Sequence, residues 1–286
     1  MARAPWPRYP EFVPARLLQG LAEWFRWPAE GILAGNGSNE LIQATLAVTV
    51  EPGDAVVAPA PTFSLYRVLT AVSGGRYLPV PLDDGFQYDM DKLINVAVRE
   101  RAKVVVLNSP NNPTGSVLPP GAVERVLSET GALVLCDEAY VDFGGPDAMK
   151  ALASSNRVVV LRTFSKALGM AGLRFGVALA HPAVAREIAK AKLPYNVNLF
   201  TLTAAEVALE HMDVRQDLVS RIIASRDRAF PRLSALPGIT VYPSAGNFFL
   251  VRDVSGVPGL EQCLRISVGT DADMVAVESA LREILG

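Results

Sequence analysis

Short apolar runs recur along the first two thirds of the chain, and several of them show no alternation with polar residues. Six runs rich in Val, Leu and Ala are expected to be strands: 54–59, 76–80, 103–107, 132–136, 157–161 and 175–180. Strands of this kind are typical of a mostly parallel sheet that helices cover on both faces. Helical patterns occupy the intervening segments 40–50, 62–73, 119–130 and 182–191. This order of elements predicts an α/β fold.

The pattern changes after about residue 204. Apolar positions on one helical stripe predict a long helix over 204–233, followed by strand-like segments within 236–253 and 263–270 and a last helix over 273–285. We therefore expect an N-terminal arm (1–14), a large domain (15–212) and a smaller α+β domain (213–286). The alternative is one continuous domain.

Composition narrows the class of protein. The 286 residues include 27 Lys and Arg against 29 Asp and Glu, and half of the chain is hydrophobic. A chain this apolar, with nearly equal numbers of acidic and basic residues, is not expected to be mainly disordered. It also has no excess of basic residues with which to bind nucleic acid. With no membrane-length apolar run and no signal-like N-terminus, we expect a soluble, cytoplasmic protein without nucleic-acid or membrane partners. Two cysteines make no disulfide framework, and two histidines disfavour a His-centred triad or metal site.

Polar residues follow three of the predicted strands directly. These segments are 108–115 (NSPNNPTG), 137–140 (DEAY) and 162–166 (RTFSK). Ligands of open α/β sheets bind beyond the carboxyl ends of the strands, so we expect these side chains to share one rim. The segment 35–40 (GNGSNE) opens a helix whose free N–H groups favour a phosphate, and Arg174 offers a second phosphate contact. Each feature alone is often structural, whereas their conjunction predicts a site.

Seven motifs occur in the order found in one protein family: GNGSNELI, APAPTFSLY, NSPNNPTG, DEAYVDF, TFSKALGMAGLRFG, NFFLVR and CLRISVGT. Over nearly the whole chain they resemble the fold-type I, pyridoxal-phosphate-dependent aminotransferases of class I/II. Two of them, DEAYVDF and CLRISVGT, are most similar to the histidinol-phosphate branch. The resemblance implies pyridoxal 5′-phosphate as cofactor. It also implies amino transfer from histidinol phosphate to 2-oxoglutarate in histidine biosynthesis.

The resemblance also assigns roles to residues. Lys166 is expected to bond to the cofactor aldehyde and then to act as general base. Asp137 is expected to keep the ring nitrogen protonated, and Tyr140 and Asn112 to donate to the ring oxygen. The remaining cofactor contacts are a ring-stacking Phe63 and a phosphate cup of Ser38, Asn39, Thr163, Ser165 and Arg174.

Three further residues are expected to reach the substrate or a second subunit. Arg265 matches the anchor for a carboxylate or its substitute, a task suited to a guanidinium. Arg252 matches a residue near the far end of the substrate, although a surface arginine is an equal alternative. Tyr9 matches a tyrosine that contacts the neighbouring subunit's cofactor phosphate, which implies a homodimer. Relative to the family, the sequence shown has no ENP-like lid segment before Tyr9, and one VRD segment serves two motifs, as expected of a shortened small domain. A reduced enzyme and a chain that lacks segments are both open interpretations of these departures.

Other activities use the same cofactor residues. A threonine-phosphate decarboxylase-like lyase would break a different bond at Cα, and an aromatic amino acid could replace histidinol phosphate as donor. A catalytically impaired, pyridoxal-phosphate-binding module is the non-enzymatic alternative.

Overall fold

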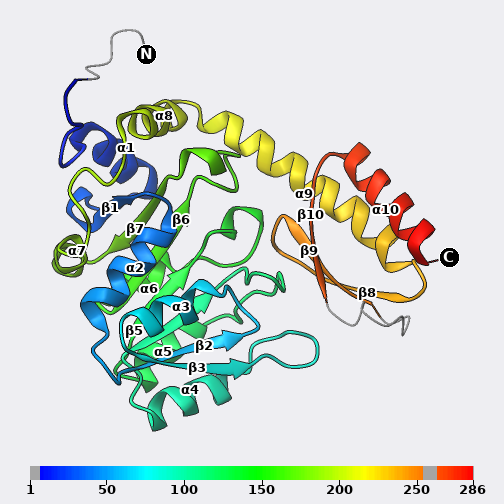
Figure 1. The fold of residues 1–286 in the computed structure, drawn as a ribbon, viewed down its shortest axis with the longest axis horizontal. Coiled ribbons are helices and arrows are strands. Elements are labelled where there is room, and N and C mark those ends of the chain that lie inside the picture. Colours follow the sequence, from blue (N-terminus) through cyan, green and yellow to red (C-terminus); the bar gives the residue numbers. More distant parts are fainter. Residues whose placement is uncertain (1–6, 254–262, 286) are drawn as a thin grey trace.

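The computed structural model describes residues 7–253 and 263–285 and contains two sheets (Figure 1). The larger sheet has seven strands in the order β1-β7-β6-β5-β4-β2-β3. These are β1 (Ile32–Gly35), β2 (Ala55–Ala60), β3 (Arg76–Pro81), β4 (Val104–Asn108), β5 (Leu133–Asp137), β6 (Val158–Thr163) and β7 (Gly176–Ala180). Neighbours from β3 to β6 are parallel, whereas β7 pairs antiparallel with both β6 and β1, so that β7 runs against the other six strands of this sheet. The predicted mostly parallel α/β sheet is therefore confirmed, and β1 is a strand that the sequence pattern did not predict.

Two separate apolar cores cover the two faces of this sheet. Successive residues of one strand alternate between them: on β4, Val105 and Leu107 face one core, and Val104 and Val106 face the other. All four side chains are buried. The absence of polar alternation follows from this arrangement, since neither face of the strands meets water.

The helices divide between the two faces. The first core is closed by α1 (Ala15–Phe25), α4 (Met90–Arg99), α5 (Ala122–Glu129), α6 (Met149–Ser154) and α8 (Leu199–Glu210). The second core is closed by α2 (Ser38–Thr49), α3 (Leu65–Val72) and α7 (Pro182–Ala189). Helices α1, α4 and α6 lie outside the helical segments that the sequence pattern predicts. Helix α5 begins three residues after the predicted start at Pro119, behind Gly121.

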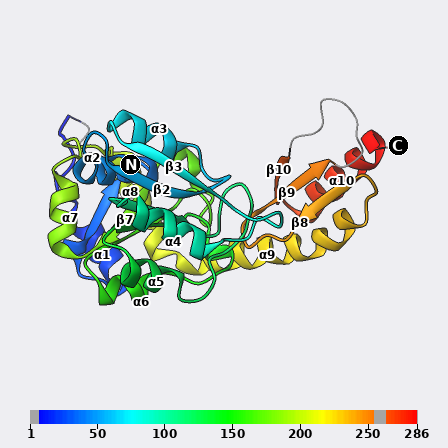
Figure 2. The same ribbon diagram turned by 90° about the horizontal axis from the view of Figure 1, so that it is seen from below.

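The single helix predicted over 204–233 is wrong. The structure contains α8 and then α9 (Met212–Ser234), and the chain breaks at His211, whose backbone angles are φ −125° and ψ 45°. Helix α8 packs against α1 and the large sheet, whereas α9 leaves this layer and runs to the second sheet (Figure 1, Figure 2). One straight helix cannot follow both directions.

The second sheet is antiparallel, with the order β10-β9-β8. Its strands are β8 (Ile239–Tyr242), β9 (Phe248–Asp253) and β10 (Leu264–Ser267). Helices α9 and α10 (Asp271–Leu285) cover one face with their own small core, which includes Leu233, Phe249 and Met274. The domain division between residues 212 and 213 stays a prediction. The VRD segment continues into residues 254–262, which lie outside the described part of the chain.

Within the two described ranges, the structure has no helix that combines the length and the apolar character needed to cross a membrane.

Candidate active site

The polar segments that follow β4, β5 and β6 meet at one edge of the large sheet. Asn108 and Asp137 are direct partners in the register of β4 and β5, and Leu161 of β6 stands opposite Asp137. A cavity of about 250 Å³ opens at this edge. Eleven of the predicted site residues line it: Ser38, Asn39, Phe63, Asn112, Asp137, Tyr140, Thr163, Ser165, Lys166, Arg174 and Arg265. Residues separated by more than two hundred positions thus share one cavity.

One wall of the cavity is built for an anion. Helix α2 begins at Ser38, and its N-cap, Gly37, provides no side chain to occupy the first N–H groups. Gly37 has φ +79°, and a Cβ at this position would lie 2.4 Å from Nη2 of Arg174. A Cβ on Gly176 of β7 would lie 2.4 Å from the backbone nitrogen of Ser38. The two glycines therefore let the helix terminus and the guanidinium approach closely, which favours a phosphate.

Side chains after β6 complete this wall. Nη1 of Arg174 donates to Oγ of Ser165 at 3.4 Å and to the backbone oxygen of Ala171 at 3.1 Å. The backbone N–H of Ser165 donates to Oγ1 of Thr163 at 3.2 Å. These bonds hold the hydroxyl groups and the guanidinium on the cavity side of the turn, where they can bind phosphate oxygens.

Asp137 lies at the base of the cavity and is 3% exposed. Its Oδ2 accepts a hydrogen bond from the hydroxyl of Tyr66 at 2.6 Å, and its Oδ1 accepts one from the backbone N–H of Ala139 at 3.1 Å. Burial raises the pKa of this carboxyl, while the two hydrogen bonds and the charge of Lys166 oppose the rise. A cationic partner in the cavity would favour the charged carboxylate further.

Lys166 and Arg265 bring positive charge to the same cavity. Nζ of Lys166 lies 5.3 Å from the ring centroid of Tyr140. Arg265 extends from β10, in the small sheet, and its Nη1 donates to Oδ1 of Asn112 at 2.9 Å and to the hydroxyl of Tyr140 at 3.2 Å. Its guanidinium also packs over the ring of Phe248, 5.0 Å from the centroid. The small sheet therefore contributes one cation to a site otherwise built by the large sheet.

Two predicted site residues do not line this cavity. Tyr9 is 81% exposed and stacks on Tyr195, with ring centroids 4.7 Å apart. Arg252 packs over the rings of Phe86 and Tyr242, at 5.3 and 5.5 Å from their centroids, and these rings meet each other edge to face. In this structure Arg252 thus links a loop of the large sheet to the small sheet.

Sequence reasoning missed two functional candidates. Tyr66 lies within the APAPTFSLY motif without an assigned role, and it holds Asp137. Asn108 is the first residue of NSPNNPTG and lines the cavity. Its amide donates to the backbone oxygen of Asp137 at 2.9 Å, and its Oδ1 accepts from the backbone N–H of Asn112 at 3.0 Å. The position of Asn108 directly after a predicted strand could have identified it as a site residue, whereas no feature of the neighbouring sequence distinguishes Tyr66.

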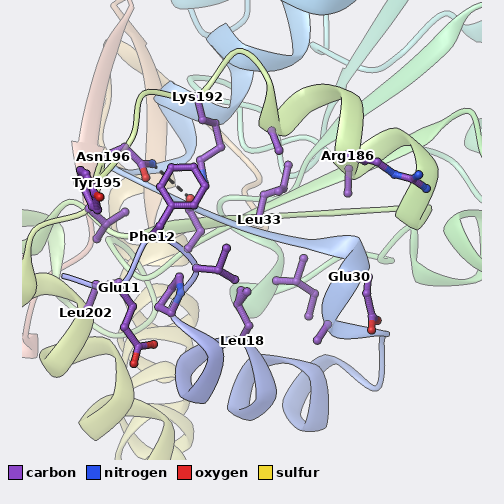
Figure 3. A pocket seen from close by; sticks show the side chains of 18 of the residues that line it. Glu11, Phe12, Leu18, Glu30, Leu33, Arg186, Lys192, Tyr195, Asn196 and Leu202 are labelled. Atoms are coloured by element: carbon purple, nitrogen blue, oxygen red, sulfur yellow. Dashed lines mark hydrogen bonds between the residues drawn. The ribbon is translucent and has the colours of Figure 1, made fainter. Parts of the chain in front are cut away.

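A larger hollow of about 470 Å³ lies beside β1 and α7 (Figure 3). It is lined mostly by apolar side chains, and Phe12, Lys192 and Tyr195 extend along it. Burial lowers the pKa of Lys192. None of the eleven predicted site residues that line the 250 Å³ cavity lines this hollow. The smaller cavity is therefore the better candidate for the active site.

The converging residues fit the cofactor that the resemblance implies. Three cations, Lys166, Arg174 and Arg265, share the cavity with the carboxylate of Asp137. A dianionic phosphate balances this charge. A Cβ on Gly37 would displace the guanidinium of Arg174, and a Cβ on Gly176 would displace the start of α2. The amine of Lys166 suits the aldehyde of this cofactor, and the buried carboxylate of Asp137 suits its protonated ring nitrogen. The aromatic ring of Phe63 suits its flat ring.

Comparison with known proteins agrees with this arrangement. The family model of class I and II aminotransferases matches residues 2–283, so the chain belongs to this family. It is 38% identical to a histidinol-phosphate aminotransferase of Roseiflexus castenholzii over 96% of this chain and 80% of that protein. It is also 38% identical to histidinol-phosphate aminotransferase 2 of Bordetella parapertussis, over 98% and 83%.

A solved structure gives the same result. The histidinol-phosphate aminotransferase of Sinorhizobium meliloti, in complex with pyridoxal-5′-phosphate, superposes with a TM-score of 0.87 and is 29% identical. The superposition covers 97% of this chain and 83% of that one. The predicted enzyme class, an aminotransferase that uses an amino donor and a 2-oxo acid, is therefore confirmed.

Proposed function

We propose that the chain transfers the amino group of histidinol phosphate to 2-oxoglutarate, with pyridoxal phosphate bound in the strand-end cavity. The main support for this proposal is that eleven predicted site residues line that cavity. The names of the relatives at 38% identity support this donor over an aromatic amino acid. Arg265 is compatible with this donor, because a guanidinium can bind a phosphate in place of a carboxylate.

When bound, pyridoxal phosphate supplies an aldehyde for the amino group and a ring that accepts the electron pair released at Cα. The residues of the chain do the rest. Ser38, Asn39 and Arg174 would bind the phosphate, and Asp137 would hold the positive charge at the ring nitrogen. Lys166 would take the proton from Cα of the donor and deliver it to the cofactor carbon that is bonded to the transferred nitrogen.

Arg265 orients the donor for this proton transfer. Its hydrogen bonds to Asn112 and Tyr140 fix the guanidinium at the mouth of the cavity. An anionic group of the substrate bound there would place Cα next to Lys166 and would help to close the cavity against water.

A half-reaction screen tests this proposal. Purified chain loaded with pyridoxal phosphate is mixed with histidinol phosphate, phenylalanine or threonine phosphate, and the visible band of the cofactor is followed. We expect histidinol phosphate to give the fastest bleaching and 2-oxoglutarate to restore the band with release of glutamate. Carbon dioxide release from threonine phosphate would instead identify a lyase. A visible band without any half-reaction would identify a binding module.

We also propose a homodimer that pairs through the surface around Tyr9. Tyr9 stacks on Tyr195, and Phe12 meets the ring of Tyr195 edge to face. Phe12, Leu193 and Tyr195 line the 470 Å³ hollow together, and all three are exposed although apolar. Leu193 borders the 470 Å³ hollow and a neighbouring hollow that reaches Asn39 of the phosphate cup. A second copy that covers this surface would bury apolar area and bring its own residues close to the cofactor phosphate.

Light scattering after size exclusion tests this pairing. Leu193→Asp should convert a dimer to a monomer and weaken cofactor binding, because a charge would be buried at the interface. Val98→Asp on α4 is the control, since Val98 is also exposed but lies on another face of the large sheet. A monomeric parent chain would contradict the pairing. The cytoplasmic location and the absence of nucleic-acid partners stay predictions from the sequence.

A further inference from the structure

Tyr66 forms a buried contact to which the family resemblance gives no role. The residue lies on α3, with no exposed surface, and its hydroxyl donates to Oδ2 of Asp137 at 2.6 Å. The two residues are 71 positions apart. The second oxygen of the carboxylate accepts from Ala139, so the two donors come from different elements. A carboxylate held at both oxygens cannot rotate freely.

The position of Tyr66 is itself fixed. Its backbone oxygen accepts a hydrogen bond from Oγ1 of Thr70 at 2.7 Å, one turn later on α3. Its ring meets the ring of Phe63 edge to face, with centroids 5.7 Å apart. Phe63 lines the cavity, so one short segment provides both an aromatic wall and the donor to the carboxylate below it.

The charges around Asp137 fix which group carries the proton. Burial raises the pKa of Tyr66 well above its ordinary value, and the neighbouring Asp137 raises it further. The hydroxyl therefore stays protonated and donates at any physiological pH. Against the burial of Asp137 itself, Tyr66, Ala139 and Lys166 each favour the charged carboxylate. Tyr88 and Tyr77 are further titratable groups near Tyr66, and both are neutral phenols, because burial raises the pKa of each.

We propose that Tyr66 is a positioning residue that acts through Asp137: its hydroxyl orients the carboxylate and keeps it anionic for the protonated ring nitrogen of the cofactor. The cofactor half of this inference rests on the proposed function, whereas the effect on Asp137 does not. A tyrosine that only fills the core would leave the ionisation of Asp137 unchanged when its hydroxyl is removed.

Tyr66→Phe tests the inference, because it removes one oxygen and leaves the packing of the ring in place. Tyr88→Phe is the matched control, since that hydroxyl donates to the backbone oxygen of Asn108 rather than to a carboxylate. In the full chain without cofactor, the pKa of Asp137 is measured by carbon NMR, with Asp137→Asn identifying the signal. We expect Tyr66→Phe to raise this pKa by about one to two units, and Tyr88→Phe to leave it within about 0.3 units. Equal values in both variants and the parent would overturn the inference.

The loaded chain provides a second readout. Tyr66→Phe should weaken pyridoxal phosphate binding about tenfold and shift the pH at which the visible band changes. In the Asp137→Asn background the same substitution should have no further effect, because Tyr66 acts only through that carboxylate. A full additional loss in this background would show a structural role instead. If the parent chain binds no pyridoxal phosphate, the proposed function fails, and the pKa measurement still decides whether Tyr66 controls Asp137.

Discussion

The two sheets contribute to the active site in different ways. At the large sheet, Asn108 and Asp137 are fixed against each other by strand register, and their side chains are buried and bonded on several sides. At the small sheet, Arg265 reaches the cavity from an exposed position on β10. It depends on two hydrogen bonds and on contact with the ring of Phe248.

This difference separates two tasks. A cofactor that remains bound is best held by groups whose positions cannot change, and the backbone of a parallel sheet provides them. A substrate that enters and leaves needs a group that can move away, and a separate sheet on α9 provides it. We therefore expect changes at the strand ends to alter cofactor binding and chemistry, and changes at the small sheet to alter substrate binding.

Lys166→Ala should have the largest effect. Without the amine at the strand ends, no group remains to move the proton at Cα, so turnover should fall about 1,000-fold or more. Steady-state assay with histidinol phosphate and 2-oxoglutarate measures this loss. Lys190→Ala, at an exposed lysine paired with Glu187, is the control and should retain activity. Near-normal turnover of Lys166→Ala would remove its assignment.

Glu138→Gln should change the pH dependence of stability. Burial raises the pKa of Glu138 from 4.5 to about 7, against the opposing charge of Arg162. The folded chain therefore keeps a proton that the unfolded chain has released, and the free energy of unfolding falls as pH rises from 4.5 to 7. This contribution, about 2 to 3 kcal/mol, should vanish in Glu138→Gln. Urea unfolding of the cofactor-free chain across this range measures it.

Asp271→Asn provides the contrast from the small-sheet region. Arg228 lowers the pKa of the exposed Asp271, so its contribution is present above the ordinary pKa and is lost as pH falls. This variant should alter stability without changing the slope between pH 5 and 7. An unchanged slope in Glu138→Gln would show that the buried carboxyl does not control it.

Arg265→Lys should affect substrate more than cofactor. The ammonium group of lysine lacks the planar guanidinium that makes two parallel hydrogen bonds to a carboxylate or phosphate. We therefore expect kcat/KM to fall about 30-fold. The affinity for pyridoxal phosphate should stay within about twofold of the parent chain, as measured by titration of the visible band. A parallel loss of both would contradict the separation of tasks between the two sheets.

Gly37→Ala should weaken the phosphate cup. The new Cβ would lie 2.4 Å from Nη2 of Arg174, so the guanidinium must shift and the affinity for pyridoxal phosphate should fall about tenfold. Gly121→Ala controls for a positive φ alone, because Gly121 has φ +77° and ψ 4° and no neighbouring atom lies within 4 Å of a new Cβ. Gly37 has ψ 164°, so Gly37→Ala carries more backbone strain, and a second background is needed to separate strain from the contact with Arg174. In Arg174→Ala chains the substitution Gly37→Ala should cause no further loss of cofactor affinity, and a full further loss would assign the effect to strain.

Arg252→Gln should have the smallest effect. The guanidinium packs over Phe86 and Tyr242, so its loss should loosen the contact between the two sheets and lower kcat/KM about threefold for every donor. Comparison of histidinol phosphate with phenylalanine measures this. A loss confined to the phosphorylated donor would instead support the substrate contact predicted from the sequence.

Much of the fold could be predicted from the local pattern of apolar and polar residues. The apolar runs predicted the strands from β2 to β7, and the polar segments after β4, β5 and β6 pointed to the edge of the sheet at which the 250 Å³ cavity opens. Strand β1 is only four residues long, and its signal was lost beside the glycines that follow it. The break at His211 was missed because apolar positions continue through it, and only the packing of α8 against α1 requires a turn there.

The sequence by itself determined the family, the strand ends that carry polar groups and the residue types that converge there, because these depend on neighbours within a few positions. The tertiary structure decided which groups touch. Tyr66 meets Asp137 across 71 positions, and Arg265 meets Asn112 across 153. Such pairs leave no local trace, since their separation along the chain is closed only when the strands align and α9 carries the small sheet to the cavity.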